Sequence, residues 1–384
     1  MCTAYFVTMI FFWYSFSSCG THFSSFFDFA IWCKCRATVK SLTFSSSVTS
    51  RMVLHRSAST MALNWLSSIV KGHPHLQSSR LCYEIFEANV ELSSILAEYG
   101  SLHLEFVYLS HVLKSPLFKK KVTKIRDVLD KAEKIQGLYP NFINADTGKW
   151  TLAYHMSLGA LGDSFYEYLI KSWIQSGKKD EQARKMYWDA SEAIRKHMVF
   201  KSKSGLTYIA ELHSGTPDHK MGHLACFCVG MFSLQAVYEK TEEKKVGILI
   251  YCLLYLPPYF NFNFLNFSGF LPFQYFSRHG ENGYILRPEV IEGFFYLWRL
   301  TGKSIYQEWV WDALTAIEKH CKVEGGYAGL HNVYDPTKGF DDVQQSFFLA
   351  ETLKYGYLTF TDASIISLDE WVFNTEAHPL PIIN

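Results

Sequence analysis

One helical design recurs along the chain, and this repetition constrains the fold more than any other feature. Apolar helical periodicity, early acids and an aromatic-rich face are shared by residues 97–112, 161–177, 287–302 and 346–358. The first three segments are each followed by a polar turn and a second amphipathic helix, at residues 118–134, 180–198 and 306–321. Two-helix units that stack on their neighbours form an α/α solenoid or a closed toroid. The sequence therefore predicts an all-α fold.

Acidic side chains stand near the starts of the predicted inner helices and again near the C-terminus. They are Glu98, Asp163, Glu167, Glu289, Glu292, Glu351 and Glu376. Stacked units place the starts of their inner helices at one end of the fold, so these acids are expected to meet there. The helix dipole alone favours a single acid in a first turn. Repetition in successive units favours a functional site, because like charges are costly to gather unless a cation or a reaction needs them.

The C-terminal stretch LDEWVFNTEAHPLPI places Thr375 beside Glu376 in apolar and aromatic surroundings. A hydroxyl, its backbone carbonyl and a carboxylate are hard oxygen donors, and Ca²⁺ takes six to eight such ligands. Asn-Thr-Glu is also a common helix cap. The acids elsewhere in the chain favour the Ca²⁺ interpretation.

Composition and charge narrow the function classes. The chain has 384 residues, of which 48% are hydrophobic and 17% aromatic, which is enough for a large core. Its formal charge of +1 gives no electrostatic case for nucleic acid. Nine scattered cysteines do not form a disulfide scaffold. His219, His223 and Cys226 have helical spacing, which leaves a zinc site open as an alternative.

Three stretches do not follow the helical design. Residues 1–33 contain an apolar run of about 14 residues, near a signal-peptide core and short of the roughly 18 of a spanning helix. This segment is predicted to direct the chain into the secretory pathway or to attach it to a membrane. Residues 34–80 are rich in Ser and Thr and are predicted to be a linker. Residues 246–283 are apolar and aromatic without a helical stripe, and they interrupt a domain predicted at 81–384.

Five motifs carry a family resemblance: GDSFYEYL, KMGHLACF, YILRPEVIE, DDVQQSFFLAETLKY and FNTEAHPLPI. They resemble the class I α-1,2-mannosidases of glycoside hydrolase family 47, which are Ca²⁺-dependent, inverting (α/α)₇ toroids. The resemblance implies that fold, Ca²⁺ as cofactor, and hydrolysis of terminal α-1,2-linked mannose from high-mannose N-glycans on glycoproteins. It also implies a place in the secretory pathway, with the Golgi ahead of the endoplasmic reticulum.

The same resemblance assigns roles to individual residues. Thr375 is expected to be the direct Ca²⁺ ligand. Glu289 resembles the general base, Asp163 the second catalytic carboxylate, and Glu87 the proton donor. Leu161 stands where endoplasmic-reticulum enzymes have Arg, which implies a Golgi-type enzyme that removes several mannoses. The residues expected to hold the sugar or the waters of the ion are Glu98, Leu161, His223, Arg287, Glu292, Phe347, Glu351 and Glu376.

The chain also departs from the family pattern. Residues 1–80 lack the opening helical motif, and about 60 residues expected between Glu87 and Glu98 are missing. The GxGPE segment is replaced within 246–283, and the disulfide expected to start at Cys226 has only Cys252 as a nearby candidate. These departures predict an incomplete toroid. They leave two alternatives to an active enzyme, namely a catalytically inactive mannose-binding relative in glycoprotein quality control and a defective truncated product.

Overall fold

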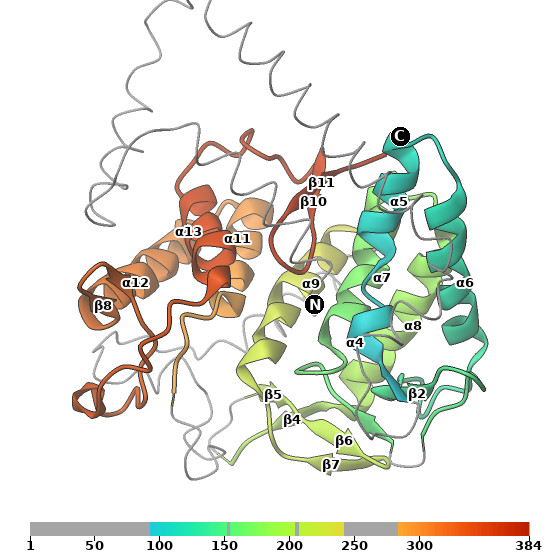
Figure 1. Ribbon diagram of the computed structural model, residues 1–384, viewed down its shortest axis with the longest axis horizontal. Coiled ribbons are helices and arrows are strands. Elements are labelled where there is room, and N and C mark those ends of the chain that lie inside the picture. Colours follow the sequence, from blue (N-terminus) through green and yellow to red (C-terminus); the bar gives the residue numbers. More distant parts are fainter. Residues whose placement is uncertain (1–92, 152–153, 204–206, 242–282, 384) are drawn as a thin grey trace, which may run out of the picture. The chain divides into compact units, whose positions relative to one another are not determined.

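A computed structural model of the chain describes residues 93–151, 154–203, 207–241 and 283–383 (Figure 1). All of them belong to one compact unit, Leu92–Asn384. Its α-helices are α4 (Leu96–Tyr99), α5 (His103–Val112), α6 (Leu117–Lys131), α7 (Asp163–Gln175), α8 (Glu181–His197), α9 (Cys228–Val237), α11 (Glu289–Thr301), α12 (Ser304–His320) and α13 (Leu353–Thr359). Two 3₁₀ turns, η1 (His223–Phe227) and η3 (Pro336–Lys338), and a π-helical turn, η4 (Phe348–Thr352), complete the helical elements of the described residues.

Short strands connect the helices and pair in small antiparallel sheets. They are β1 (Ser93–Ile95), β2 (Phe142–Asn144), β3 (His155–Met156), β4 (Val199–Lys201), β5 (Thr207–Ile209), β6 (Glu211–His213), β7 (Thr216–Asp218), β8 (Lys322–Val323), β9 (Gly326–Tyr327), β10 (Trp371–Phe373) and β11 (Pro379–Pro381). β3, β6 and β7 form a three-stranded sheet, and the remaining strands pair as β1–β2, β4–β5, β8–β9 and β10–β11. Strands this short give the sequence little period-two signal, so the helices dominate its pattern.

The helices pack in the pairs that the sequence predicts. α5 packs against α6, α7 against α8, and α11 against α12 (Figure 1). The first helices of the pairs contact one another directly or through α9, since α7 contacts both α5 and α9 while α11 contacts α9 and α13. The described residues therefore have the all-α, paired-helix architecture expected from the repeats.

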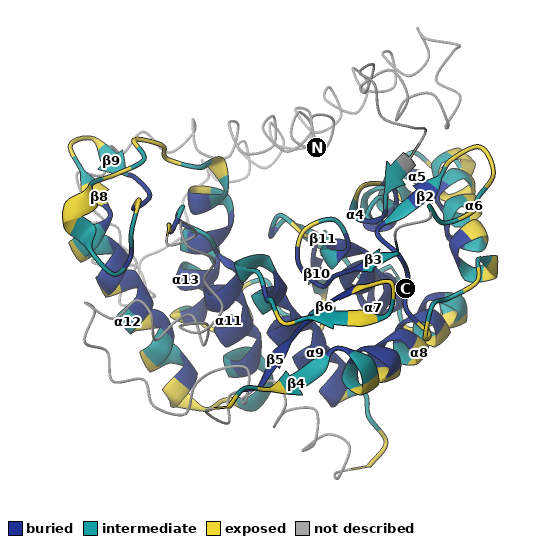
Figure 2. Ribbon diagram, turned by 90° about the horizontal axis from the view of Figure 1, so that it is seen from below, coloured by how far each residue is buried: buried dark blue, intermediate teal, exposed yellow. Residues whose placement is uncertain are grey.

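Burial separates the inner helices from the outer ones (Figure 2). Every residue of α7 except Asp163 is buried, and α11 is buried from Glu289 to Leu297. α8 buries one face only and carries charged residues on the other. A helix that is apolar nearly all round belongs in a core, whereas an amphipathic one covers it. This difference places the starts of α7 and α11 inside the protein.

Local chemistry fixes the ends of these helices. The Asp180 carboxylate accepts a hydrogen bond of 3.1 Å from the Ala183 amide and so caps α8. Basic residues occupy the last turn of α8, where they complement the helix dipole. Gly302 caps the C-terminal end of α11, and its φ of 68° is the left-handed conformation that glycine adopts without strain.

The predicted helix at 97–112 is two helices in the structure. α4 ends at Tyr99, and α5 begins at His103. At Gly100 between them, a Cβ atom would lie 2.6 Å from the Phe165 ring and 2.5 Å from the Leu96 carbonyl oxygen. The backbone therefore approaches α7 more closely than any side chain at this position would allow.

The predicted helix at 346–358 also differs, because its first part, Phe348–Thr352, is a wide π turn that continues into α13. Glu351 lies in this turn and is buried. π turns inside helices occur often at functional sites. Glu351 therefore lies at a backbone irregularity of the kind that functional sites often contain.

Some predictions fall outside the described residues. They concern the segment 1–33, the linker 34–80, the insert at 246–283 except for Gly283, and the proton donor Glu87. Among the described residues, none of the helices has both the length and the apolar character needed to cross a membrane.

Candidate active site

Six carboxyl groups from α7, α11, η4 and the β10–β11 turn lie close enough for their charges to interact. They are Asp163, Glu167, Glu289, Glu292, Glu351 and Glu376, and are called the acid cluster below. Asp163 and Glu289 are the first residues of their helices, and Glu292 stands in the first turn of α11. The structure thus brings together acids that are separated by more than 200 residues in the sequence.

Glu289 is compensated by two basic groups. The His223 ring donates a hydrogen bond of 2.7 Å from Nδ1 to Glu289 Oε2, and Arg287 Nη1 lies 3.8 Å from Oε1. Burial alone would raise the pKa of this carboxyl, but His223 and Arg287 together hold the pKa below its usual value. Glu289 is therefore a carboxylate at neutral pH, which is the state that a general base requires.

Glu167 forms a buried ion pair with Lys171, one turn further along α7. The Lys171 ammonium also lies over the Tyr296 ring, 5.4 Å from its centroid. Burial would lower the pKa of Lys171, but Glu167 outweighs this effect and raises it. The charge of Glu167 is thus balanced inside the protein, and the pair depends on both partners because an unpaired buried charge is costly.

Glu351 and Glu376 instead face each other and share a hydrogen bond. Burial raises the pKa of both carboxyls, and the negative charge of Glu376 raises that of Glu351 further. Lys354 donates a hydrogen bond of 2.8 Å to the Ala377 carbonyl nearby, but burial lowers its own pKa to about 8. Glu351 and Glu376 both raise the pKa of Lys354 against this effect of burial, so two carboxyls face one basic group in this part of the acid cluster.

Glu292 and Asp163 have raised pKa values for the same reasons. Burial, with Glu167 as the leading charge, raises the pKa of Glu292 to about 8, although Glu292 accepts a hydrogen bond of 3.2 Å from the Tyr355 hydroxyl. Burial also raises the pKa of Asp163 to about 6, and Glu167 and Glu289 add to this effect. Asp163 Oδ1 accepts a hydrogen bond of 2.8 Å from the Ser164 amide, which fixes the side chain at the start of α7.

Thr375 occupies the turn between β10 and β11, and the side chain of Asn374 shapes this turn. Asn374 Oδ1 accepts hydrogen bonds from the backbone amides of Glu376 and His378, at 3.0 and 2.8 Å. The Thr375 amide lies 3.4 Å from the hydroxyl of Tyr168 on α7. The turn therefore holds Thr375, which is exposed, beside α7 and next to the acid cluster.

Sequence reasoning missed Glu105, a buried carboxylate that supports this turn. Glu105 Oε1 accepts hydrogen bonds from the Tyr168 hydroxyl at 2.6 Å and from Asn374 Nδ2 at 2.9 Å. Burial raises its pKa, and its second oxygen, Oε2, has no hydrogen-bond partner within the described ranges. Glu105 lies in the first turn of α5. The same early-acid signal would have found it had the break at Gly100 been recognised.

Glu98 and Leu161 lie together at the edge of the acid cluster. Backbone hydrogen bonds join α4 to the start of α7, since the Ala97 amide donates to the Leu161 carbonyl at 3.0 Å. Leu161 has a φ of 80°, a conformation that non-glycine residues seldom adopt. Glu98 is exposed and is not among the charges that shift the pKa of the acid cluster. The structure thus places Glu98 beside the cluster rather than inside it.

Arg287 and Phe347 are half-buried at the entrances to α11 and η4. The Arg287 carbonyl accepts a hydrogen bond of 3.2 Å from the Tyr284 hydroxyl, which fixes the backbone immediately before Glu289. Phe347 precedes the π turn that carries Glu351. Their predicted roles in sugar binding remain predictions.

The zinc alternative at His219, His223 and Cys226 is wrong, because these side chains have different partners. His219 Nδ1 lies 2.6 Å from the Tyr208 hydroxyl, while His223 is bonded to Glu289. Cys226 is a free thiol, and burial raises its pKa to about 12. The three side chains do not form a group with the spacing of metal ligands in the described part of the chain. Cys252, the candidate partner of Cys226 in the expected disulfide, lies outside the described residues, so this disulfide stays a prediction.

Comparison with known proteins identifies the family. A helical fold that gathers acids from the starts of its inner helices is what the resemblance to α-1,2-mannosidases predicts. The model of glycosyl hydrolase family 47 matches residues 46–255 and 270–382. The chain belongs to this family.

Three curated relatives illustrate the similarity. The chain is 59% identical over 306 residues to mannosyl-oligosaccharide 1,2-alpha-mannosidase mans-2 of Caenorhabditis elegans, a match covering 76% of the chain and 50% of that protein. It is 49% identical over 306 residues to mannosyl-oligosaccharide 1,2-alpha-mannosidase IA of Sus scrofa, covering 76% and 45%. It is 50% identical over 305 residues to the human enzyme IB, covering 76% and 47%. The chain spans about half the length of these relatives.

A solved structure supports the fold. The alpha-1,2-mannosidase from Trichoderma reesei matches with a TM-score of 0.68 and 26% sequence identity, over 77% of this chain and 67% of that one. This likeness confirms the predicted all-α fold class of the (α/α) toroid.

Proposed function

We propose that this chain hydrolyses terminal α-1,2-linked mannose from high-mannose N-glycans with inversion at the anomeric carbon, and that Ca²⁺ is its cofactor. The acid cluster supports this proposal most strongly. Its carboxyl groups are buried or half-buried, they come from α7, α11, η4 and the β10–β11 turn of a family 47 chain, and their pKa values differ. Carboxyl groups with pKa values moved in opposite directions are the usual basis of acid and base roles in glycoside hydrolysis.

Glu289 is proposed as the general base. Its carboxylate accepts a proton from a water molecule as the water oxygen attacks the anomeric carbon from the face opposite the leaving group. His223 and Arg287 keep this carboxylate ionised and fix its orientation. The attack releases β-mannose from an α-linkage.

Protonation of the departing glycosidic oxygen requires an acid on the other side of the sugar. Asp163, whose pKa burial raises to about 6, is half protonated at about pH 6 and is proposed as the second catalytic carboxylate. Glu87, which lies outside the described residues, is proposed as the proton donor on the strength of its family motif. Asp163 and Glu289 influence each other electrostatically, which supports a common site.

The residues around Thr375 fit a hard divalent cation. Thr375 supplies a hydroxyl and a carbonyl oxygen, and Glu351 and Glu376 add two carboxyl groups whose charged forms burial disfavours and a bound cation would favour. Thr375 is proposed as the direct ligand, with Glu98, Glu292, Glu351 and Glu376 holding waters of the ion or sugar hydroxyls. Bound Ca²⁺ would supply a fixed positive charge that orients the sugar and the attacking water.

Leu161 is proposed to make the enzyme Golgi-type, so that it removes several mannoses from one glycan. Leu161 lies two residues before Asp163 and adjoins the exposed Glu98, where a branch of the glycan would pass. Leu161→Arg is expected to narrow the products to a single trimmed glycan, as chromatography of the products over time would show. An unchanged product series would remove Leu161 from this role. A site in the Golgi membrane or lumen is proposed on the same resemblance.

Release of free mannose from a nine-mannose glycan tests the proposal. The full chain with Ca²⁺ is expected to release mannose, a chelator to stop the release, and added Ca²⁺ to restore it. If the folded chain binds the glycan but releases no mannose under any of these conditions, it is an inactive mannose-binding relative. A chain that shows no cooperative thermal unfolding would instead be a defective product.

A further inference from the structure

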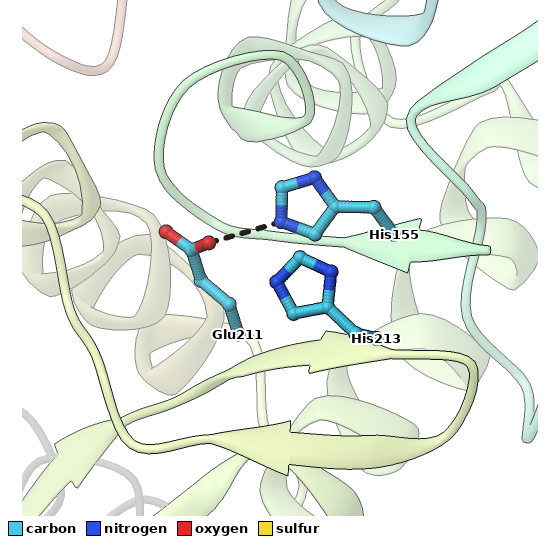
Figure 3. Close-up of side chains that lie close together, drawn as sticks. All are labelled: His155, Glu211 and His213. Atoms are coloured by element: carbon cyan, nitrogen blue, oxygen red, sulfur yellow. Dashed lines mark hydrogen bonds and ion pairs between the residues drawn. The ribbon is translucent and has the colours of Figure 1, made fainter. Parts of the chain in front are cut away.

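A second group of metal-binding side chains lies on the three-stranded β3–β6–β7 sheet (Figure 3). It consists of His155, Glu211 and His213, and none of these residues belongs to the acid cluster. The ligand atoms of the three side chains all lie within 4.8 Å of one another. Among the described residues this is the group whose spacing fits a metal ion.

Strand geometry explains why the three side chains converge. Glu211 and His213 are two residues apart on β6 and therefore point to the same face of the sheet. His155 on β3 is directly opposite His213 in the antiparallel register. Directly opposed side chains are close neighbours, and the two imidazole rings stack with centroids 4.3 Å apart and planes inclined by 5° (Figure 3).

The immediate contacts combine nitrogen and oxygen donors. His155 Nε2 lies 2.9 Å from Glu211 Oε2, and the two side chains are 20% and 14% exposed. The side chain of His213 is 55% exposed, so its ring is able to rotate towards a bound ion. Asp218, the cross-strand neighbour of Glu211, has its Oδ2 3.8 Å from His213 Nε2 and offers a fourth ligand.

The side chain of Asn141 contacts His155 Nδ1, and its orientation decides which nitrogen of the His155 ring carries the proton. Asn141 is fully buried, and its Nδ2 lies 3.2 Å from His155 Nδ1, while its Oδ1 has no hydrogen-bond partner in the described part of the chain. The Ser157 carbonyl oxygen and Asn141 Oδ1 lie 2.3 and 2.7 Å from where a Cβ on Gly162 would stand, so two acceptors share this space. The oxygen and nitrogen of an Asn amide are told apart by their hydrogen bonds. Exchanging the two atoms of Asn141 places its nitrogen, rather than its unpaired oxygen, beside the Ser157 carbonyl oxygen.

With the amide reversed, its oxygen takes the position 3.2 Å from His155 Nδ1 and accepts a hydrogen bond from that nitrogen when it is protonated. The neutral ring then directs the lone pair of Nε2 at the Glu211 carboxylate, 2.9 Å away. Two acceptors at that distance require a proton or a metal ion between them. A histidine whose second ring nitrogen donates to an amide oxygen is the usual arrangement of a metal ligand.

We propose that His155, Glu211 and His213 bind a transition-metal ion of the Zn²⁺ class, with Asn141 orienting His155. Two imidazoles and one carboxylate match zinc, which accepts nitrogen and oxygen ligands in a tetrahedral arrangement. Ca²⁺ prefers oxygen alone, so this site and the acid cluster select different ions. The proposal does not depend on the chain being a mannosidase.

Such an ion would join two segments that lead to the acid cluster. β3 is followed by the loop that ends at Asp163, and β6 and β7 precede η1, which carries His223. Glu211 Oε1 is also 3.9 Å from where a Cβ on Gly159 would stand, and the Gly159 carbonyl accepts the Asp163 amide at 3.1 Å. The bound ion would therefore brace the segments that position Asp163 and His223.

Titration with Zn²⁺ and Co²⁺ tests the proposal on the full chain, with excess Ca²⁺ present to occupy the acid cluster. We expect Zn²⁺ binding at one site, and with Co²⁺ the visible absorption of a nitrogen-ligated ion. His213→Ala should weaken Zn²⁺ binding on the order of 100-fold or more and abolish that absorption. The control is His331→Ala, which removes an exposed histidine outside the cluster and should leave both signals unchanged.

His213 is more than half exposed, so its replacement is not expected to unfold the chain, and circular dichroism checks this. The Co²⁺ spectrum of the unmodified chain is a second measurement that needs no variant. Equal Zn²⁺ affinity in His213→Ala and the parent chain would overturn the proposal. So would the absence of a Co²⁺ signal, which would leave an imidazolium–carboxylate pair as the description of His155 and Glu211.

Discussion

Glu167 and Glu289 each face a basic group of the protein, whereas Glu351 and Glu376 face each other. The first two carboxylates lie on α7 and α11, where their charges are balanced by Lys171 and by His223 with Arg287. Burial raises the pKa of the second pair, and the two carboxyls share the attraction of one ammonium, that of Lys354, whose own pKa burial lowers to about 8. A carboxylate with its own basic partner stays ionised and can serve as a general base or in a structural ion pair. Two facing carboxyls with raised pKa values favour a bound cation.

Removal of the charge of Glu289 is expected to have the largest effect. Glu289→Gln keeps the size of the side chain but cannot accept the proton of the attacking water. We expect kcat for mannose release to fall about 10²- to 10⁴-fold, with glycan binding preserved. Glu181→Gln, an exposed acid at the start of α8, is the matched control and should retain full activity. Turnover within twofold of the parent chain would remove Glu289 as the base.

Loss of the buried basic partner is expected to affect stability strongly. Lys171→Met leaves Glu167 buried without a counter-charge, so the free energy of unfolding should fall by about 3–5 kcal/mol in denaturant titrations. Lys185→Met is the control, because Lys185 forms an ion pair of the same spacing with Asp189 on the exposed side of α8. The control should change stability little. An equal loss of unfolding free energy in the two variants would show that burial does not make the Lys171–Glu167 pair more important for stability than the exposed pair.

Removal of one of the facing carboxyls, Glu351 and Glu376, should affect stability in the opposite direction. Glu351→Gln replaces a carboxyl whose ionisation is costly beside Glu376 with a neutral group of the same size, so the chain without Ca²⁺ should unfold at the same temperature or higher. The same substitution should weaken Ca²⁺ binding about 10- to 100-fold in calorimetric titrations. Glu370→Gln, an exposed acid close to β10, is the control for both measurements. A large destabilisation of Glu351→Gln in chelator would contradict the account of this pair.

The smallest expected effect is on the pH dependence of stability. Asp163 and Glu292 have folded-state pKa values of about 6 and about 8, above their values in an unfolded chain. These two carboxyls therefore bind more protons in the folded state than in the unfolded state between about pH 4 and pH 8, and the stability that they contribute falls as pH rises through this window. In chelator the melting temperature should be higher at pH 5.5 than at pH 8, and Ca²⁺ should reduce the difference. A melting temperature that rises with pH in chelator would contradict these shifts.

The helix pairs were predictable from the sequence because their periodicity and early acids repeat in each unit. The breaks within them were less visible. Gly100 ends α4 because the backbone meets Phe165 on a helix that is distant in the sequence. The π turn at Phe348–Thr352 likewise has no counterpart in the apolar pattern. Such features depend on tertiary contacts, which a local pattern does not contain.

The site was predicted in part for the same reason. Acids at the starts of inner helices carry a repeating signal, and the structure brings Asp163, Glu289 and Glu351 together. Glu105 was missed because the break at Gly100 was not recognised, so that the first turn of α5 was taken as the middle of a helix. His155 and Glu211 come from strands of two and three residues, and only strand pairing makes them neighbours.

The anomeric form of the first sugar released by the full chain tests the central claim most directly. Proton NMR of a high-mannose glycan digested in the presence of Ca²⁺ distinguishes the two anomers before they interconvert. Attack by water held at Glu289 predicts that β-mannose forms first. Initial release of α-mannose, or no release by a folded chain with Ca²⁺ bound, would contradict the account.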